Sequence, residues 1–141
     1  MSAWGLGPFD NDDALDWLGD FLESPDRGLV WVPLGTSKPA RLRRALRRPY
    51  LSKYLDMGHT ERAIVAAEVI AAACGSPSDE APDELCDWAQ RRVLKLDRLR
   101  RPAMRVATYL RDAPAYRRLF LDDNDYPEWQ GHVDDLIKRL S

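Results

Sequence analysis

The feature that most constrains the fold of this chain is the run TERAIVAAEVIAAAC at residues 60–74. It is apolar on every side of the helix that it would form, except at Glu61, Arg62 and Glu68. A helix that is apolar all round has to be surrounded by other elements. Thr60 is a candidate N-cap, and Gly75 is a candidate terminator. The run therefore predicts a buried central helix over about residues 60–74.

Amphipathic segments on both sides of this run predict helices that pack around it. Apolar residues recur at helical spacing after Asn11, between Pro39 and Arg48, and again towards the C-terminus, and Pro49 is expected to start a separate turn. We therefore expect an all-α fold, a compact single-domain bundle of five to seven helices over residues 1–141. Residues 29–34 are the only strand-like run. Because Pro33 interrupts it, we expect a loop or one short extended segment there.

The net charge, its distribution along the chain and the length of the apolar runs limit the class of protein. The net charge is only −2, but residues 41–54 contain six basic and no acidic side chains, while residues 55–90 contain one basic and eight acidic ones. Such blocks indicate complementary faces within a fold or between partners. No secretory signal pattern opens the sequence, and the longest apolar run is too short to span a bilayer. We expect a cytoplasmic protein that does not enter a membrane.

Two cysteines without a CxxC spacing are too few for a disulfide framework and match no zinc pattern. The sequence also lacks a Ser-His-Asp order, an HExxH motif and a phosphate-binding glycine loop. We therefore expect no cofactor, no metal and no enzymatic activity. Glu68 is the one carboxylate inside the apolar run, and we expect it to pair with an arginine of a flanking basic helix.

The first candidate site is a basic helix with five arginines: Arg41, Arg43, Arg44, Arg47 and Arg48. Three interpretations stay open. The arginines can form a solvated face or pair with acidic residues of the same chain. They can hold an acidic protein partner. They can also grip nucleic-acid phosphates, with Tyr50 and Tyr54 near for stacking.

The second candidate is an N-terminal motif that combines a glycine turn, two aromatic residues and several acids: Trp4, Gly5, Gly7, Phe9, Asp10, Asn11, Asp12, Asp13 and Asp16. Asp10 or Asn11 can cap the following helix, and the acids of its first turn suit the helix dipole. Several carboxylates could also hold a divalent cation, although their spacing does not match a calcium loop. A structural clamp and a metal site both remain possible interpretations.

The same motif carries a family resemblance. The opening WGLGPFDNDDALDWL, the later ERAIVAAEVIAAACG and a tryptophan-bearing C-terminal helix resemble the bacterial domain-of-unknown-function family 4259. The resemblance implies a small single-domain fold that covers nearly the whole chain. It implies no activity, because that family has none that can be carried over.

Together these observations favour a small interaction protein that binds a protein partner by charge complementarity. One form of this hypothesis is an immunity or antitoxin protein, which neutralises its partner. The first alternative is a nucleic-acid-binding module that uses the basic helix. The second is a metal-dependent hydrolase that uses the acidic cluster at residues 10–16.

Overall fold

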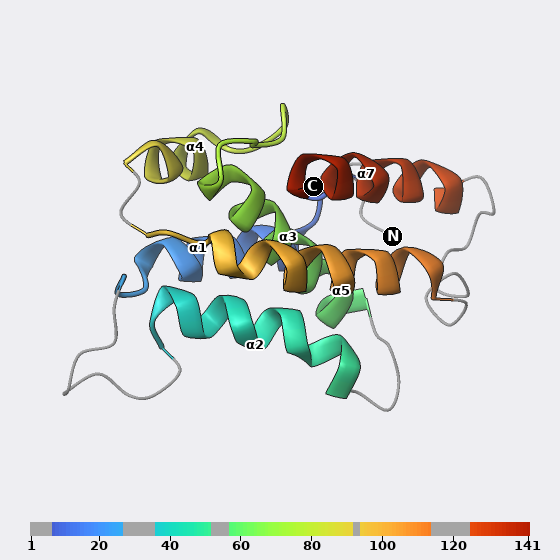
Figure 1. Cartoon of the computed structure of the whole chain (residues 1–141), viewed down its shortest axis with the longest axis horizontal. Coiled ribbons are helices and arrows are strands. Elements are labelled where there is room, and N and C mark those ends of the chain that lie inside the picture. The colour runs from blue at the N-terminus through green and yellow to red at the C-terminus, as the bar shows by residue number, and fades with distance from the viewer. Residues whose placement is uncertain (1–6, 27–35, 52–56, 92–93, 114–124) are drawn as a thin grey trace.

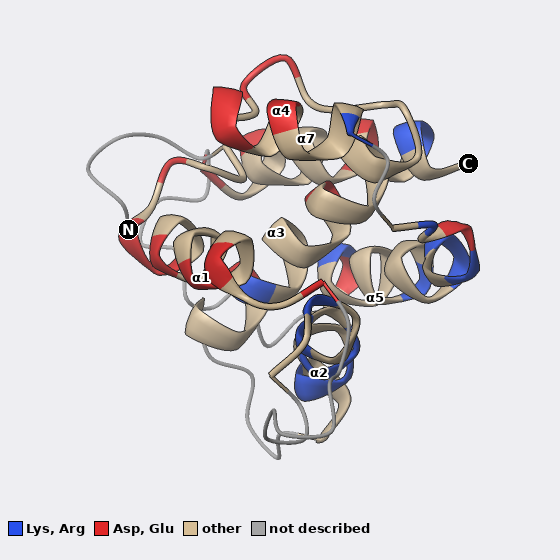
Figure 2. Cartoon of the chain, turned by 90° about the vertical axis from the view of Figure 1, so that its left-hand side faces the viewer, with Lys and Arg blue, Asp and Glu red and all other residues tan. Residues whose placement is uncertain are grey.

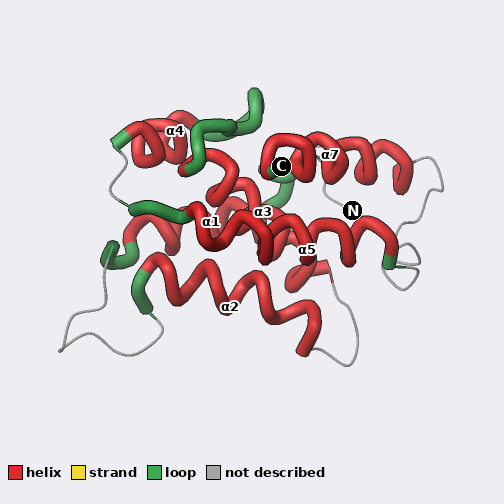
Figure 3. The backbone as a smooth tube through the Cα atoms, viewed as in Figure 1, coloured by secondary structure: helices red, strands yellow, loops and turns green. Residues whose placement is uncertain are grey.

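The computed structural model describes residues 7–26, 36–51, 57–91, 94–113 and 125–141. These ranges contain six α-helices and one short 3-10 helix, and no strand (Figure 3). The all-α prediction is confirmed, whereas residues 29–34 lie outside the described ranges. The elements are α1 (Asp12–Glu23), α2 (Lys38–Leu51), α3 (Met57–Ala73), α4 (Asp83–Gln90), η1 (Asp97–Leu99), α5 (Arg100–Asp112) and α7 (Asp125–Leu140).

Helix α3 is the centre of the bundle (Figure 1). It packs against each of the other five α-helices. Every residue from Ala63 to Ala72 is buried, including Glu68. The alanines let the surrounding helices approach closely, while the branched side chains between them fill the remaining space. The prediction of a buried central helix is confirmed.

The two ends of α3 differ in how well the sequence predicts them. The helix begins at Met57, so Thr60 lies within its first turn and is not the N-cap. The extra turn packs Met57 against the core, and its His59 accepts a hydrogen bond from Arg48 on α2. At the other end Gly75 adopts φ +96°, and the amides of Gly75 and Ser76 donate to Ala72 and Ala71. This is a Schellman motif, as the glycine predicts.

Helix α1 begins as the acidic motif predicts. Asn11 is the N-cap, and its side-chain oxygen accepts a hydrogen bond from the Ala14 amide at 2.7 Å. Asp12 and Asp13 occupy the first turn, where the helix dipole favours negative charge. The buried face of α1 consists of Ala14, Leu18 and Phe21.

Helix α2 is longer than predicted. The sequence analysis ends it at Arg48 and starts a new turn at Pro49, but the helix continues through Pro49 to Leu51. Proline lacks an amide proton, so the helix loses one backbone hydrogen bond in its last turn. The Pro49 ring is buried against the core, and this burial offsets part of the loss.

Glu68 is 1% exposed and forms an ion pair with Arg139 of α7. Both guanidinium Nη atoms donate to its two carboxylate oxygens at 2.8 Å. Burial raises the pKa of Glu68, and the hydrogen bonds and charge of Arg139 act in the opposite direction. The expected pairing is therefore present, but the expected partner is wrong. The arginine comes from the acid-rich C-terminal segment, because α7 is the helix that packs beside Glu68.

Candidate functional site

The register of α2 sends its apolar residues inward and its arginines outward. Leu42, Ala45 and Leu46 are buried against the other helices, as predicted. Arg43, Arg44, Arg47 and Arg48 are exposed, and Arg41 is partly exposed. We call these five residues the α2 arginines. Figure 2 shows basic residues along α2 and acidic residues on α1 and α4, on another side of the molecule.

Lys38 fixes the start of α2 against the end of α1. Its buried ammonium group donates to the Ser24 carbonyl, pairs with Asp26 at 2.9 Å and lies 5.7 Å from the centre of the Phe21 ring. A buried cation with these partners is satisfied and anchors the helix. The charge of Lys38 is therefore used within the fold.

No ion pair in the described part of the chain includes an α2 arginine. Two of them make hydrogen bonds to uncharged groups. Arg41 Nε donates to the Thr36 carbonyl at 3.2 Å, and Arg48 Nε donates to His59 Nε2 at 3.3 Å. The described residues therefore give no support to the interpretation that these arginines pair with acidic residues of the same chain.

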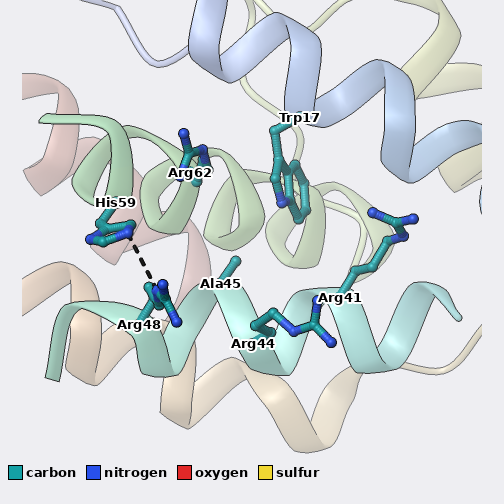
Figure 4. A pocket seen from close by; sticks show the side chains of 7 residues that line it. All are labelled: Trp17, Arg41, Arg44, Ala45, Arg48, His59 and Arg62. Atoms are coloured by element: carbon teal, nitrogen blue, oxygen red, sulfur yellow. Dashed lines mark hydrogen bonds between the residues drawn. The ribbon is translucent and has the colours of Figure 1, made fainter. Parts of the chain in front are cut away.

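On one side of α2 the arginines border a pocket of about 420 Å³ between α1, α2 and α3 (Figure 4). We call it the basic pocket. Arg44 and Arg48 reach it from α2, Arg62 comes from α3, and Trp17 points into it from α1. The described residues that line it are Trp17, Arg41, Arg44, Ala45, Arg48, His59 and Arg62. Among these residues are four guanidinium groups and no carboxylate.

On the other side of α2 a second depression, of about 400 Å³, lies between α2 and α5. We call it the tyrosine groove. Its lining consists of Arg43, Leu46, Arg47, Tyr50, Leu99, Pro102 and Arg105. The Tyr50 ring lies 4.9 Å from the Tyr109 ring, and both side chains are substantially exposed. Partial burial and the neighbouring Tyr109 raise the pKa of Tyr50, so its hydroxyl stays protonated at neutral pH.

The ridge between these two depressions is formed by the outer face of α2. Arg43, Arg44, Arg47 and Arg48 border a shallow hollow of about 310 Å³, which Leu51 closes at one end. Leu51 is 75% exposed and Tyr50 is 50% exposed. Exposed apolar side chains next to arginines are a composition found at protein interfaces.

Near the basic pocket, Glu61 and Arg62 lie in the first two turns of α3, close to Asp13 of α1. Burial and the charge of Asp13 raise the pKa of Glu61 to about 7. Arg62 approaches Asp13 to only 4.0 Å, and both side chains are well exposed. An ion pair of this kind contributes little to stability, so Arg62 is held only weakly by its acidic neighbour.

The described part of the N-terminal motif forms a hydrogen-bonded turn that leads into α1. Asp10 Oδ2 accepts a hydrogen bond from the Gly7 amide at 2.8 Å, and the Asp10 amide donates to the Gly7 carbonyl. A Cβ at Gly7 would lie 2.5 Å from a carboxylate oxygen of Glu80 and 2.6 Å from one of Asp10, so a larger residue there would displace these two side chains. Phe9 is buried in the core, and Asp12, Asp13 and Asp16 are exposed on α1. Trp4 and Gly5 lie outside the described residues.

The described residues contain no group of three or more His, Cys, Asp or Glu side chains placed to hold a metal ion. Asp10 and Asn11 direct a side-chain oxygen to backbone amides instead. None of the described helices is both long and apolar enough to cross a membrane.

The structure thus defines a small helical protein with a basic, arginine-rich surface over one helix. The chain belongs to the family described as "Domain of unknown function (DUF4259)", whose family model matches residues 2–132. The resemblance drawn from the N-terminal motif is therefore confirmed. The comparisons with curated proteins and with solved structures give no match.

Sequence analysis found the α2 arginines but missed the other residues of the basic pocket. Nothing in the sequence pattern connects Trp17, His59 or Arg62 with α2. One signal was present in the sequence, because Arg41, Arg44 and Arg48 have the i, i+3, i+7 spacing of a single helix stripe. The contribution of α1 and α3 depends on how three helices pack together.

Proposed function

We propose that this protein is a cytoplasmic, non-enzymatic binding protein that holds an acidic protein partner against the outer face of α2. The observation that carries the proposal is the combination on one helix of exposed arginines with exposed Tyr50 and Leu51. Arginine supplies charge complementarity and bidentate hydrogen bonds to carboxylates. Tyrosine and leucine supply apolar area that becomes buried on association.

The apolar residues favour a protein partner over nucleic acid. A phosphate backbone would use the arginines, and a base could stack on Tyr50, but Leu51 offers nothing specific to a phosphate or a base. A protein partner can cover Leu51 and Tyr109 together with the arginines. Neutralising a partner in this way is the task of an immunity or antitoxin protein, and we propose that role for the surface.

The test compares capture of partners by the wild-type protein with capture by two charge-matched variants. The first variant changes Arg43, Arg44, Arg47 and Arg48 to Gln. The control changes four exposed cations on other parts of the chain to Gln: Arg91, Lys95, Arg98 and Lys138. Bound proteins are identified by mass spectrometry, and bound nucleic acid is sequenced. Each candidate is then purified and its dissociation constant is measured by calorimetry at two salt concentrations.

We expect an acidic protein whose affinity falls at least tenfold with the α2 variant and less than threefold with the control. A Leu51→Asp variant should weaken the same complex, because it places a charge in the apolar part of the interface. Salt-dependent binding of DNA or RNA without a protein partner would contradict the proposal and support the nucleic-acid alternative. Equal loss in both four-residue variants would also contradict it, because only net charge would then matter.

A further inference from the structure

The basic pocket has a chemistry different from that of the outer face of α2. It is a concave space between three helices, and the charged side chains that line it within the described part of the chain are all positive. Arg41, Arg44 and Arg48 lie on one stripe of α2, and Arg62 lines the pocket from α3 (Figure 4). Like charges gathered around one cavity repel each other, and this repulsion disappears when a multivalent anion occupies the cavity.

Guanidinium groups favour phosphate as that anion. Each guanidinium is a planar fork of donors that matches two oxygens of one phosphate, and it stays charged at all physiological pH values. A single carboxylate would leave most of the four positive charges uncompensated. Two or three linked phosphates carry enough charge and enough acceptor oxygens for the whole set.

Trp17 adds an aromatic wall to the pocket. Its ring stacks on Phe21 with a centroid distance of 5.3 Å and an interplanar angle of 11°, so Phe21 supports one side of the indole. Trp17 also lines the pocket, and in Figure 4 its side chain points from α1 towards α2. A supported indole beside cationic groups is a suitable platform for a planar heterocycle.

From these observations we propose that the basic pocket binds a nucleoside di- or triphosphate, with the phosphates on the arginines and the base against Trp17. The volume of about 420 Å³ lies within the range of small-molecule sites. Ala45 forms part of the lining, and its small side chain leaves room for the ligand. The pocket shares Arg44 and Arg48 with the outer face of α2, whereas Trp17, His59 and Arg62 line the pocket and not that face.

The helix itself offers a matched control for the test. Arg44 and Arg48 line the basic pocket, whereas Arg43 and Arg47 line the tyrosine groove on the other side of α2. The two pairs have the same spacing, charge and helix. Binding of ATP, GTP, adenosine and inorganic tripolyphosphate is measured by calorimetry for the wild type, Arg44→Gln/Arg48→Gln and Arg43→Gln/Arg47→Gln. Thermal unfolding of each variant checks that it is folded.

We expect ATP or GTP to bind the wild type, with at least a tenfold loss of affinity in Arg44→Gln/Arg48→Gln and less than a threefold loss in Arg43→Gln/Arg47→Gln. Arg62→Gln should weaken binding as well, and it lies outside α2. Nucleotide should bind at least fivefold more tightly than tripolyphosphate, and Trp17→Phe should reduce that preference. Similar losses in the two α2 pairs, no nucleotide binding at millimolar concentration, or equal binding of tripolyphosphate and ATP would each overturn the proposal.

The outcome is separable from that of the partner experiment. Loss of partner binding in Arg43→Gln/Arg47→Gln with nucleotide binding intact would support both proposals. Nucleotide binding without any protein partner would contradict the proposed function and leave this inference standing.

Discussion

Arg139 and the α2 arginines differ in burial and in ion pairing. Arg139 is mostly buried and forms bidentate hydrogen bonds with Glu68 in the centre of the bundle. The α2 arginines are largely exposed, and no ion pair reaches them within the described residues. The first arrangement neutralises a charge that the fold has buried. The second leaves exposed positive charge, for which we propose the two binding roles above, so the contrast sets a structural arginine against arginines that we propose to be functional.

The largest effect is expected when the buried pair is broken. In Arg139→Met the carboxylate of Glu68 stays buried without its partner, which costs about 3–5 kcal/mol of unfolding free energy. Urea denaturation at neutral pH measures the loss. The control is Arg111→Met, because Arg111 pairs with Asp112 and Asp134 at the surface and the cost there is about 0–1 kcal/mol. Equal losses in the two variants would remove the distinction between the buried and surface pairs.

A double variant sharpens this result. Glu68→Leu combined with Arg139→Met removes both charges and places apolar side chains in their positions. We expect it to recover most of the stability lost by Arg139→Met alone, because a buried ion pair is often no more stable than an apolar pair of similar volume. A double variant as unstable as Arg139→Met would show that the loss came from packing and not from an unpaired charge.

The sequence was sufficient to predict the helices and the helix faces that depend on local residue pattern. The apolar run predicts α3, Gly75 predicts its end, and the arginine spacing predicts the exposed face of α2. The capping signal at Thr60 failed because α3 begins earlier, at Met57, which packs against the core. Pro49 failed as a helix terminator because it is buried in the last turn.

Contacts between residues that are far apart in the sequence could not be predicted in the same way. Glu68 and Arg139 are 71 residues apart in the chain, and nothing in the acid-rich C-terminal segment marks Arg139 as the partner. The basic pocket draws Trp17, Arg44 and Arg62 from three helices. Their convergence follows from how α1 and α2 pack on α3, and the helical period of each segment alone does not contain that information.

Glu61 provides an intermediate case, a half-buried carboxylate near both Asp13 and Arg62. Its pKa is raised to about 7 by burial and by Asp13, against about 4.5 for the ordinary group. The folded state therefore retains a proton that the unfolded state loses between those pH values, and the contribution of Glu61 to stability falls as pH rises from about 4.5 to about 7.

Glu61→Gln should remove this pH dependence. The variant and the wild type should have similar stability near pH 4.5, and the variant should be more stable at pH 8. The expected gain is about 1 kcal/mol, reduced from the full linkage value because the group is partly solvated. Urea midpoints measured at both pH values give the difference. A gain that is the same at pH 4.5 and pH 8 would contradict the raised pKa as its cause.

The smallest effect concerns the α2 arginines in the free protein. Arg44 and Arg48 form a like-charge i, i+4 pair, and Arg41 and Arg62 add two further positive charges to the lining of the basic pocket. Arg44→Gln/Arg48→Gln should therefore stabilise the protein by about 0.2–0.5 kcal/mol in low salt. The gain should shrink at about 1 M salt, where charges are screened beyond about 3 Å. Arg43→Gln/Arg47→Gln has the same spacing but faces the tyrosine groove, where Arg105 is the one further cation among the described lining residues, so its gain should be smaller. If the pocket pair instead loses stability in low salt, its arginines stabilise the fold. They would then resemble Arg139, and the separation between structural and functional arginines would fail at the basic pocket.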